Sequence, residues 1–237
     1  MSEQSRDLHD WQPRPQPEPI TLEGRWAVLE PLSATRHALD LWKAVLGEDH
    51  IWDWMADGPY LSESSFVQGI EAKEFGAAAR FFAICPRLPD GAVGPAKGYA
   101  SLMRIDAAHG VVEVGNVLFS PSLQRTLAAT EAIFLMARYV FEDLGYRRYE
   151  WKCNDLNLPS RRAADRFGFQ YEGVFRQHMV IKGQNRDTAW FAMLDGDWPA
   201  RRKAFEFWLS PDNFDAQGRQ RSTLQTISAG LDQNRAR

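Results

Sequence analysis

The chain has almost none of the residues that build metal centres or disulfide frameworks. Only two of its 237 residues are cysteine, Cys85 and Cys153. Because they lie far apart, with no CxxC or Cys/His spacing around them, the sequence favours neither a zinc site nor a disulfide framework. We therefore expect no metal site and interpret both thiols as reduced and buried.

The chain also lacks a long apolar run. Its first residues, "MSEQSRDLHDWQPRPQPEP", contain no apolar signal core, and no later stretch approaches the roughly 18 consecutive apolar residues of a membrane helix. The 28 basic residues are balanced by 31 acidic ones, giving a formal charge of −3. Neither a membrane nor a nucleic acid is therefore expected as a partner, and the expected location is the cytoplasm.

The chain is long enough to bury a substantial core in one domain, and no linker divides it. Residues 1–19 carry alternating prolines, which favours a disordered or extended arm. We place a single domain at residues 20–210. Residues 211–237 are predicted to be a polar, mobile tail.

What the sequence does contain is a regular succession of strand and helix patterns. Period-two alternation predicts strands, and a 3.6-residue apolar period with capping residues predicts helices. The predicted strands span residues 25–32, 80–86, 97–106, 111–120 and 148–153, with a terminal hairpin at 169–194. The predicted helices span residues 33–46, 63–75, 123–144, 157–168 and 198–209.

The strand, helix and strand between Val111 and Cys153 form a crossover unit that places two parallel strands side by side. The surrounding hairpins add antiparallel strands. The expected fold class is therefore α+β (mixed α/β), with a central mixed, twisted sheet of about six to seven strands flanked by helices.

Two stretches of the chain suggest a family: "LQRTLAATEA", and "RRYEWKCNDLNLPSRRAADRFGFQYEGVFR" after it. They resemble the GNAT superfamily of acetyl-CoA-dependent N-acetyltransferases, and most closely the branch that acetylates the N-termini of ribosomal proteins. The resemblance covers roughly Leu22 to Pro199, and "CNDLNLPSRRAADRFGF" is its most specific part. It implies splayed central parallel strands, with acetyl-CoA as the acetyl donor between them.

A helix that opens just after a strand presents unpaired backbone N–H groups and a positive dipole end, which together bind pyrophosphate. The resemblance places the coenzyme A pyrophosphate at such a turn, usually Gln/Arg-x-x-Gly-x-Gly/Ala. This chain has Leu127 where that glycine is expected, so either its side chain points into the core or the pocket is closed. The expected cofactor-binding residues of this turn are Gln124, Arg125, Thr126, Leu127, Ala128, Ala129 and Thr130.

The start of the following short helix supplies a second candidate group. By resemblance, Asn157 hydrogen-bonds the pantetheine region and Ser160 protonates the departing thiolate. Residues three apart in a helical turn share one face. The alternative is that Asn157 is only an N-cap and Ser160 only bonds back to it. The resemblance also implies that the backbone at Asn116 and Val117 hydrogen-bonds the pantetheine and polarises the acetyl carbonyl.

Glu113 is the candidate base, since an amine that arrives as ammonium must lose a proton before it attacks. On its strand, the Glu113 side chain points to the face opposite to that of Val112 and Val114. The alternative is an exposed carboxylate that pairs with Arg104 on a neighbouring strand.

The acceptor amine is expected near an acidic, aromatic stretch, because carboxylates and indole faces suit a cation. The candidate substrate-binding residues are Trp52, Asp53, Trp54 and Tyr60. The alternative is that the tryptophans are core anchors. His178 is interpreted as an ordinary packed or surface residue.

The predicted function is transfer of an acetyl group from acetyl-CoA to a primary amine, on a small molecule or a peptide N-terminus, in a ternary complex. One alternative is a non-catalytic sensing or interaction module of the same fold that has lost acetyl-CoA binding. Another is a partner-dependent enzyme acting on a polypeptide N-terminus. A homodimer is possible through the helix that contains Phe205, Phe207 and Trp208.

Overall fold

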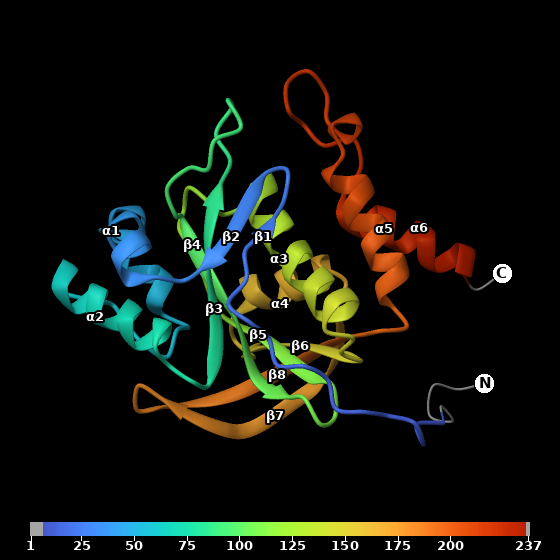
Figure 1. Ribbon diagram of the computed structural model, residues 1–237, viewed down its shortest axis with the longest axis horizontal. Coiled ribbons are helices and arrows are strands. Elements are labelled where there is room, and N and C mark those ends of the chain that lie inside the picture. Colours follow the sequence, from blue (N-terminus) through green and yellow to red (C-terminus); the bar gives the residue numbers. More distant parts are fainter. Residues whose placement is uncertain (1–6, 236–237) are drawn as a thin grey trace.

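The computed structural model describes residues 7–235, and its centre is one mostly antiparallel eight-stranded sheet (Figure 1). The strand order is β1-β2-β3-β4-β5-β6-β8-β7. The sheet has one strand more than expected, because the two-residue β1 was not distinguished in the sequence. The strands are β1 (Leu22–Glu23), β2 (Ala27–Pro31), β3 (Ala79–Pro86), β4 (Gly98–Asp106), β5 (Val111–Phe119), β6 (Arg148–Asn154), β7 (Gln170–Ile181) and β8 (Gln184–Leu194).

Helices cover both faces of this sheet. In Figure 1, α1 and α2 lie on one side of β2–β4, and α3 to α6 lie on the other. Each side encloses its own core cluster of buried side chains. The helices are α1 (Ala34–Val45), α2 (Glu63–Glu74), α3 (Leu127–Arg138), α4 (Leu158–Arg166), α5 (Trp198–Leu209) and α6 (Leu224–Arg235), with short turns η2 (Asp49–Trp52), η3 (Tyr139–Asp143) and η4 (Pro211–Asn213). Within residues 7–235 no helix has the length and hydrophobicity to cross a membrane.

Helix α3 begins at Leu127 and not at Leu123 as the apolar period predicted. Thr126 is its N-cap, and the Thr126 hydroxyl accepts a hydrogen bond from the Ala129 N–H at 3.1 Å. Arg125, just before the cap, has a φ of 62°. A left-handed residue cannot continue a right-handed helix, so the chain turns before the helix starts.

The two parallel strands β5 and β6 separate along their length. They pair from Val111 opposite Arg148 to Val114 opposite Trp151, although β5 continues to Phe119. On the other edge of β5, a bulge places Asn116 and Val117 opposite a single residue of β4, and Asn116 has a φ of 47°. A bulge bends its strand, so the expected splayed opening lies beyond Val114 and Trp151.

The N-terminal arm is extended and lies against the domain from residue 7 onward, while residues 1–6 of the predicted arm fall outside the described residues. The Arg14 N–H donates to the Ala107 carbonyl at 2.8 Å, the Trp11 indole to Ala108 at 2.7 Å and the Tyr146 hydroxyl to Pro15 at 3.1 Å. These contacts fix the arm beside the β4–β5 turn.

Part of the segment predicted to be a mobile polar tail instead folds into α6, which packs on α5. Residues 236–237 of that segment lie outside the described residues. Leu224 is only 1% exposed, and the buried Arg201 forms an ion pair with Asp232 at 2.5 Å. The apolar residues of α6 recur three or four apart, at Leu224, Ile227 and Leu231, among polar residues that hid the pattern. In α5, Phe205 and Trp208 are buried in the chain's own core, whereas Phe207 is exposed.

Candidate active site

The start of α3 lies at the end of β5, beside the opening. The backbone N–H groups of Leu127 and Ala128 have no hydrogen-bond partner within the helix, because no helical carbonyl lies four residues before them. The Leu127 side chain is partly buried and packs against the main core. The backbone at this turn is therefore available to an anion even though glycine is absent.

The other residues predicted for this turn have separate tasks. The Gln124 amide donates to the Phe119 carbonyl at 3.0 Å and ties the turn to β5. The Arg125 side chain is exposed. Ala128, Ala129 and Thr130 are buried, and the Thr130 hydroxyl donates to the Thr126 carbonyl at 3.3 Å. Arg125 is thus the exposed cation of this turn.

The start of α4 lies on the opposite side of the opening. Asn157 is its N-cap, and the Asn157 side-chain oxygen accepts the Ser160 N–H at 3.1 Å. The Ser160 hydroxyl oxygen accepts the Trp151 indole N–H at 3.0 Å. The capping bond of the simpler alternative is therefore present, and it leaves the Asn157 amide N–H groups for other partners. The Ser160 side chain also forms a hydrogen bond with the Cys153 side chain.

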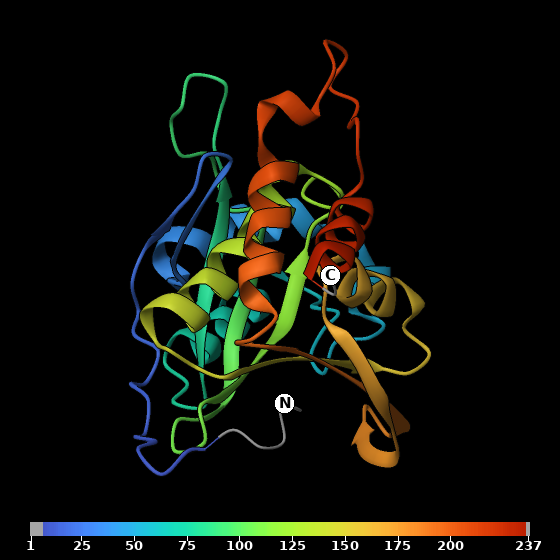
Figure 2. The same ribbon diagram turned by 90° about the vertical axis from the view of Figure 1, so that its right-hand side faces the viewer.

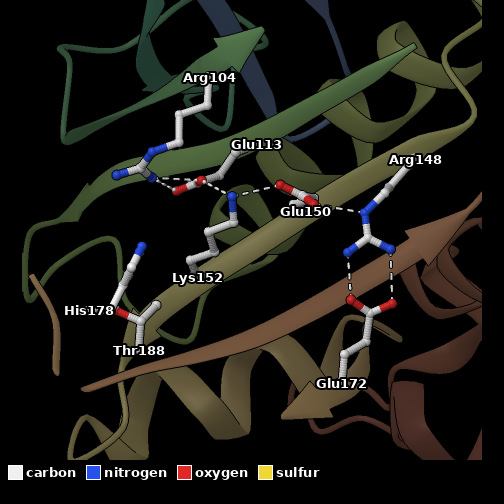
Figure 3. Close-up of polar contacts among 8 residues, drawn as sticks. All are labelled: Arg104, Glu113, Arg148, Glu150, Lys152, Glu172, His178 and Thr188. Carbon is white, nitrogen blue, oxygen red and sulfur yellow. Dashed lines mark hydrogen bonds and ion pairs between the residues drawn. The ribbon is translucent and has the colours of Figure 1, made fainter. Parts of the chain in front are cut away.

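Glu113 lies on the face of β5 opposite α3 and is only 3% exposed. Both of its carboxylate oxygens accept from Arg104 at 2.7 Å, and Lys152 lies 3.1 Å away. The predicted pair with Arg104 is present, but the carboxylate is buried instead of exposed. Figure 3 shows Lys152 between Glu113 and a second carboxylate, Glu150, at 2.7 Å.

This network continues along β6. Arg148 contacts Glu150 at 2.7 Å and reaches Glu172 on β7 at 2.5 Å (Figure 3). The hydrogen bonds from Arg148 lower the pKa of Glu172. The Lys152 ammonium also lies 3.7 Å above the Trp190 ring, a favourable cation–π contact. Three cations face three carboxylates, so the network balances its own charge.

Lys152 and Glu150 were not predicted as site residues. The available signal was the alternation of charged residues at positions 148, 150 and 152 on a strand next to Glu113. Alternation places these side chains on one face of the sheet. A central strand with charges on one face indicates either solvent or a polar site there.

The predicted acceptor residues divide into two groups. Trp52 is 3% exposed and packs edge-on against Tyr60 and Phe66 in the second core cluster. The Tyr60 hydroxyl donates to Asp57 at 2.7 Å. Asp53 and Trp54 are exposed. Only Asp53 and Trp54 therefore present side chains at the surface, and Trp52 is a core anchor.

The β7–β8 hairpin reaches from the far edge of the sheet towards this loop (Figures 1 and 2). At its tip, the Lys182 ammonium donates to the Trp52 carbonyl at 3.0 Å. His178 on the same hairpin is exposed, and its Nδ1 lies 3.0 Å from the Thr188 hydroxyl, which fits its interpretation as an ordinary packed or surface residue. The hairpin and the 49–60 loop thus flank the face that carries Glu113.

Comparisons with known proteins agree with this geometry. The family described as acetyltransferase (GNAT) domain matches residues 27–170. A GCN5-related N-acetyltransferase from Brucella melitensis has a TM-score of 0.89 at 46% identity, covering 94% of this chain and 100% of that chain. A GNAT-family structure from Chromobacterium violaceum has a TM-score of 0.75 at 37% identity, over 84% of this chain and 98% of that one.

A curated relative gives the same assignment. The uncharacterized N-acetyltransferase YnaD of Bacillus subtilis is 25% identical over 169 residues, which are 66% of this chain and 96% of the relative. The family match spans more than half of the chain and includes β5, β6 and the starts of α3 and α4. The chain therefore belongs to the GNAT acetyltransferase family and is an acyltransferase.

Proposed function

We propose that the protein transfers the acetyl group of acetyl-CoA to a primary amine by direct attack in a ternary complex. The observation that carries this proposal is the opening between β5 and β6 beyond Val114 and Trp151, flanked by the starts of α3 and α4. Such an opening admits an extended ligand between two strands. The helix start at its edge supplies the N–H groups that a pyrophosphate needs.

The residues around the opening fit acetyl-CoA. The free N–H groups at Leu127 and Ala128 and the exposed Arg125 suit its phosphates. Next to the opening, the side-chain oxygen of Asn116 is buried and has no hydrogen-bond partner among residues 7–235. A buried acceptor without a donor is costly, and the amide N–H groups of a pantetheine arm are suitable donors. The Asn157 amide adds a donor for a pantetheine carbonyl.

When bound, acetyl-CoA supplies the thioester carbonyl that the amine attacks. The side chains of this chain would then handle the protons. Ser160 accepts a hydrogen bond from Trp151, which leaves its own hydroxyl hydrogen to be donated to the Cys153 side chain or, with acetyl-CoA bound, to the departing sulfur. A carboxylate offers about four acceptor positions, and Arg104 and Lys152 together make three contacts with Glu113. One position is left for the amine proton, directly or through a water.

Titration calorimetry with acetyl-CoA tests this function, with dephospho and desulfo analogues as controls. Saturable one-to-one binding, weakened by loss of the phosphate, is expected. Absence of binding at millimolar acetyl-CoA would contradict it and favour the non-catalytic module of the same fold. The branch that acetylates ribosomal-protein N-termini stays a prediction, and assays of peptide and small-molecule amines with the loaded enzyme separate the two acceptor classes.

A further inference from the structure

Arg186 lies on the same face of the sheet as the ion network. Side chains alternate along a strand, and on β8 Trp190 is paired with Lys152 while Thr188 is paired with Asn154. Arg186 precedes Thr188 by two residues, so it shares their face. Because β6 ends at Asn154, Arg186 lies past the end of that strand, on the side where β5 and β6 separate.

Arg186 has no anionic partner among residues 7–235. The Arg186 side chain is only partly exposed, and its Nε atom is buried and makes no hydrogen bond. Burial lowers the pKa of Arg186, and the nearby cation of Arg104 adds to this effect, while Cys153 and the more distant Glu113 carboxylate oppose it. A charged group that is removed from water without a partner is unfavourable. A bound anion would therefore stabilise the Arg186 guanidinium.

The neighbouring groups do not meet that need. The carboxylate of Glu113 is already held by Arg104 and Lys152, and the network of three cations and three carboxylates is balanced without Arg186. Lys182 on the same hairpin adds another cation, which donates to a carbonyl and not to a carboxylate. On the strands and hairpin beside the opening, the cations therefore outnumber the carboxylates that pair with them.

We propose that Arg186 binds a carboxylate carried by the acceptor amine, with Arg104 beside it. The acceptor is then an amine with its own negative charge, either an amino acid or a peptide whose acidic side chain lies near its N-terminus. Guanidinium groups bind carboxylates through two parallel hydrogen bonds, which also orient the ligand. This inference rests on the proposed acetyl transfer and specifies its substrate class.

The same cations favour the reactive form of the amine. A positive charge nearby disfavours a second positive charge, so an ammonium that enters this face loses its proton more readily. The carboxylate supplies the attraction that brings the acceptor in. An acceptor without that anion would lack this attraction.

The test compares matched amines that differ only in the carboxylate. With saturating acetyl-CoA, release of the coenzyme A thiol is followed for L-serine against L-serinamide, L-methionine against L-methioninamide, and the peptide Ser-Asp-Ala-amide against Ser-Asn-Ala-amide. The first two pairs probe an amino acid, and the third probes an acidic peptide. In at least one pair, the carboxylate member is expected to have a kcat/KM higher by about tenfold or more.

Arg186→Gln is expected to reduce that ratio to near one, and Arg186→Lys to an intermediate value. Arg176→Gln, which removes an exposed arginine of the same hairpin, is the matched control and should leave the ratio unchanged. Unchanged thermal unfolding and acetyl-CoA affinity in each variant show that the fold and the cofactor site are intact.

Equal kcat/KM for both members of every pair would overturn the proposal. So would an unchanged ratio in Arg186→Gln, or a uniform loss of kcat for both members, which would assign Arg186 to the thioester instead. If acetyl-CoA binds but no carboxylate amine reacts, this inference fails while the acetyl-CoA site stands. If acetyl-CoA itself does not bind, the proposed function fails first.

Discussion

Lys152 shows how much a single buried residue determines in this site. Its side chain is 5% exposed and lies between Glu113 and Glu150, which are also buried. Breaking a buried ion pair by removing one partner is far more costly than forming the pair is favourable, because the remaining charge has no water around it. Lys152 thus holds two carboxylates that would otherwise repel each other.

We expect Lys152→Met to lower the free energy of unfolding by about 3–5 kcal/mol, since methionine fills similar space without the charge. The exposed Arg202, which pairs with Glu206, gives the control Arg202→Met, with an expected loss of about 0–1 kcal/mol. Urea unfolding at neutral pH measures both. Equal stability of the two variants would contradict a structural role for Lys152.

Ser160→Ala tests the proposed proton donor at the same scale. We expect kcat to fall by about 10²-fold or more, as is typical for loss of a positioned acid, while acetyl-CoA affinity is retained. Trp151→Phe, which removes the N–H that orients Ser160, should give a smaller loss. The assay is thiol release from saturating acetyl-CoA with a reactive amine. Full activity of Ser160→Ala would exclude it as the donor.

At the scale of the element, the ends of helices explain where the sequence pattern misplaced a boundary or a cap. Ser33 stands at the N-cap of α1 as predicted, but its side chain makes no capping bond. Instead, His37 Nδ1 accepts the Ser33 N–H at 3.0 Å, and Glu74 of α2 accepts the Ala34 N–H at 2.7 Å. His37 lies one turn into α1 itself, whereas Glu74 belongs to α2, so a local pattern could not reveal the second acceptor.

This arrangement predicts a pH dependence. His37 is buried, and burial lowers its pKa below 6.5, with Arg36 adding to the effect and the Glu30 hydrogen bond opposing it. The unfolded state therefore binds more protons than the folded state as pH falls through 6.5, so the stability present above that pH decreases. Protonation at Nδ1 would also remove the acceptor for the Ser33 N–H.

Urea unfolding at pH 7.5 and pH 5.5 tests this dependence. The loss of unfolding free energy at the lower pH should be smaller in His37→Gln than in the wild type. His50→Gln, at a mostly exposed histidine, should keep the wild-type loss. If His37→Gln loses as much stability on acidification as the wild type, His37 is not the responsible group.

At the scale of the whole molecule, α6 connects parts of the chain that are distant in sequence. It packs on α5 through the pair of Asp232 with Arg201. It also reaches α4, where the Gln225 amide donates to Asp165 at 2.9 Å. Because α4 carries Asn157 and Ser160 at its start, α6 supports the helix that holds one side of the candidate site.

Leu224→Ala tests whether α6 is an integral part of the domain. Leu224 is buried, and deletion of buried leucine atoms costs about 2–5 kcal/mol. Leu231→Ala, at a partly buried position of the same helix, should cost less. The measurement is cooperative unfolding by urea. A Leu224→Ala variant as stable as the wild type would support the sequence-based view of a mobile tail.

The sequence alone determined the strands, most helices and the mixed sheet, because periodicity of apolar residues is set by the geometry of strands and helices. It also determined the family, through "CNDLNLPSRRAADRFGF". Only the tertiary structure decided that Leu127 packs against the core, that Trp52 is buried, and that Glu113, Glu150 and Lys152 form one network. Burial and charge pairing depend on contacts between residues far apart in the chain, and a local sequence pattern cannot predict those contacts.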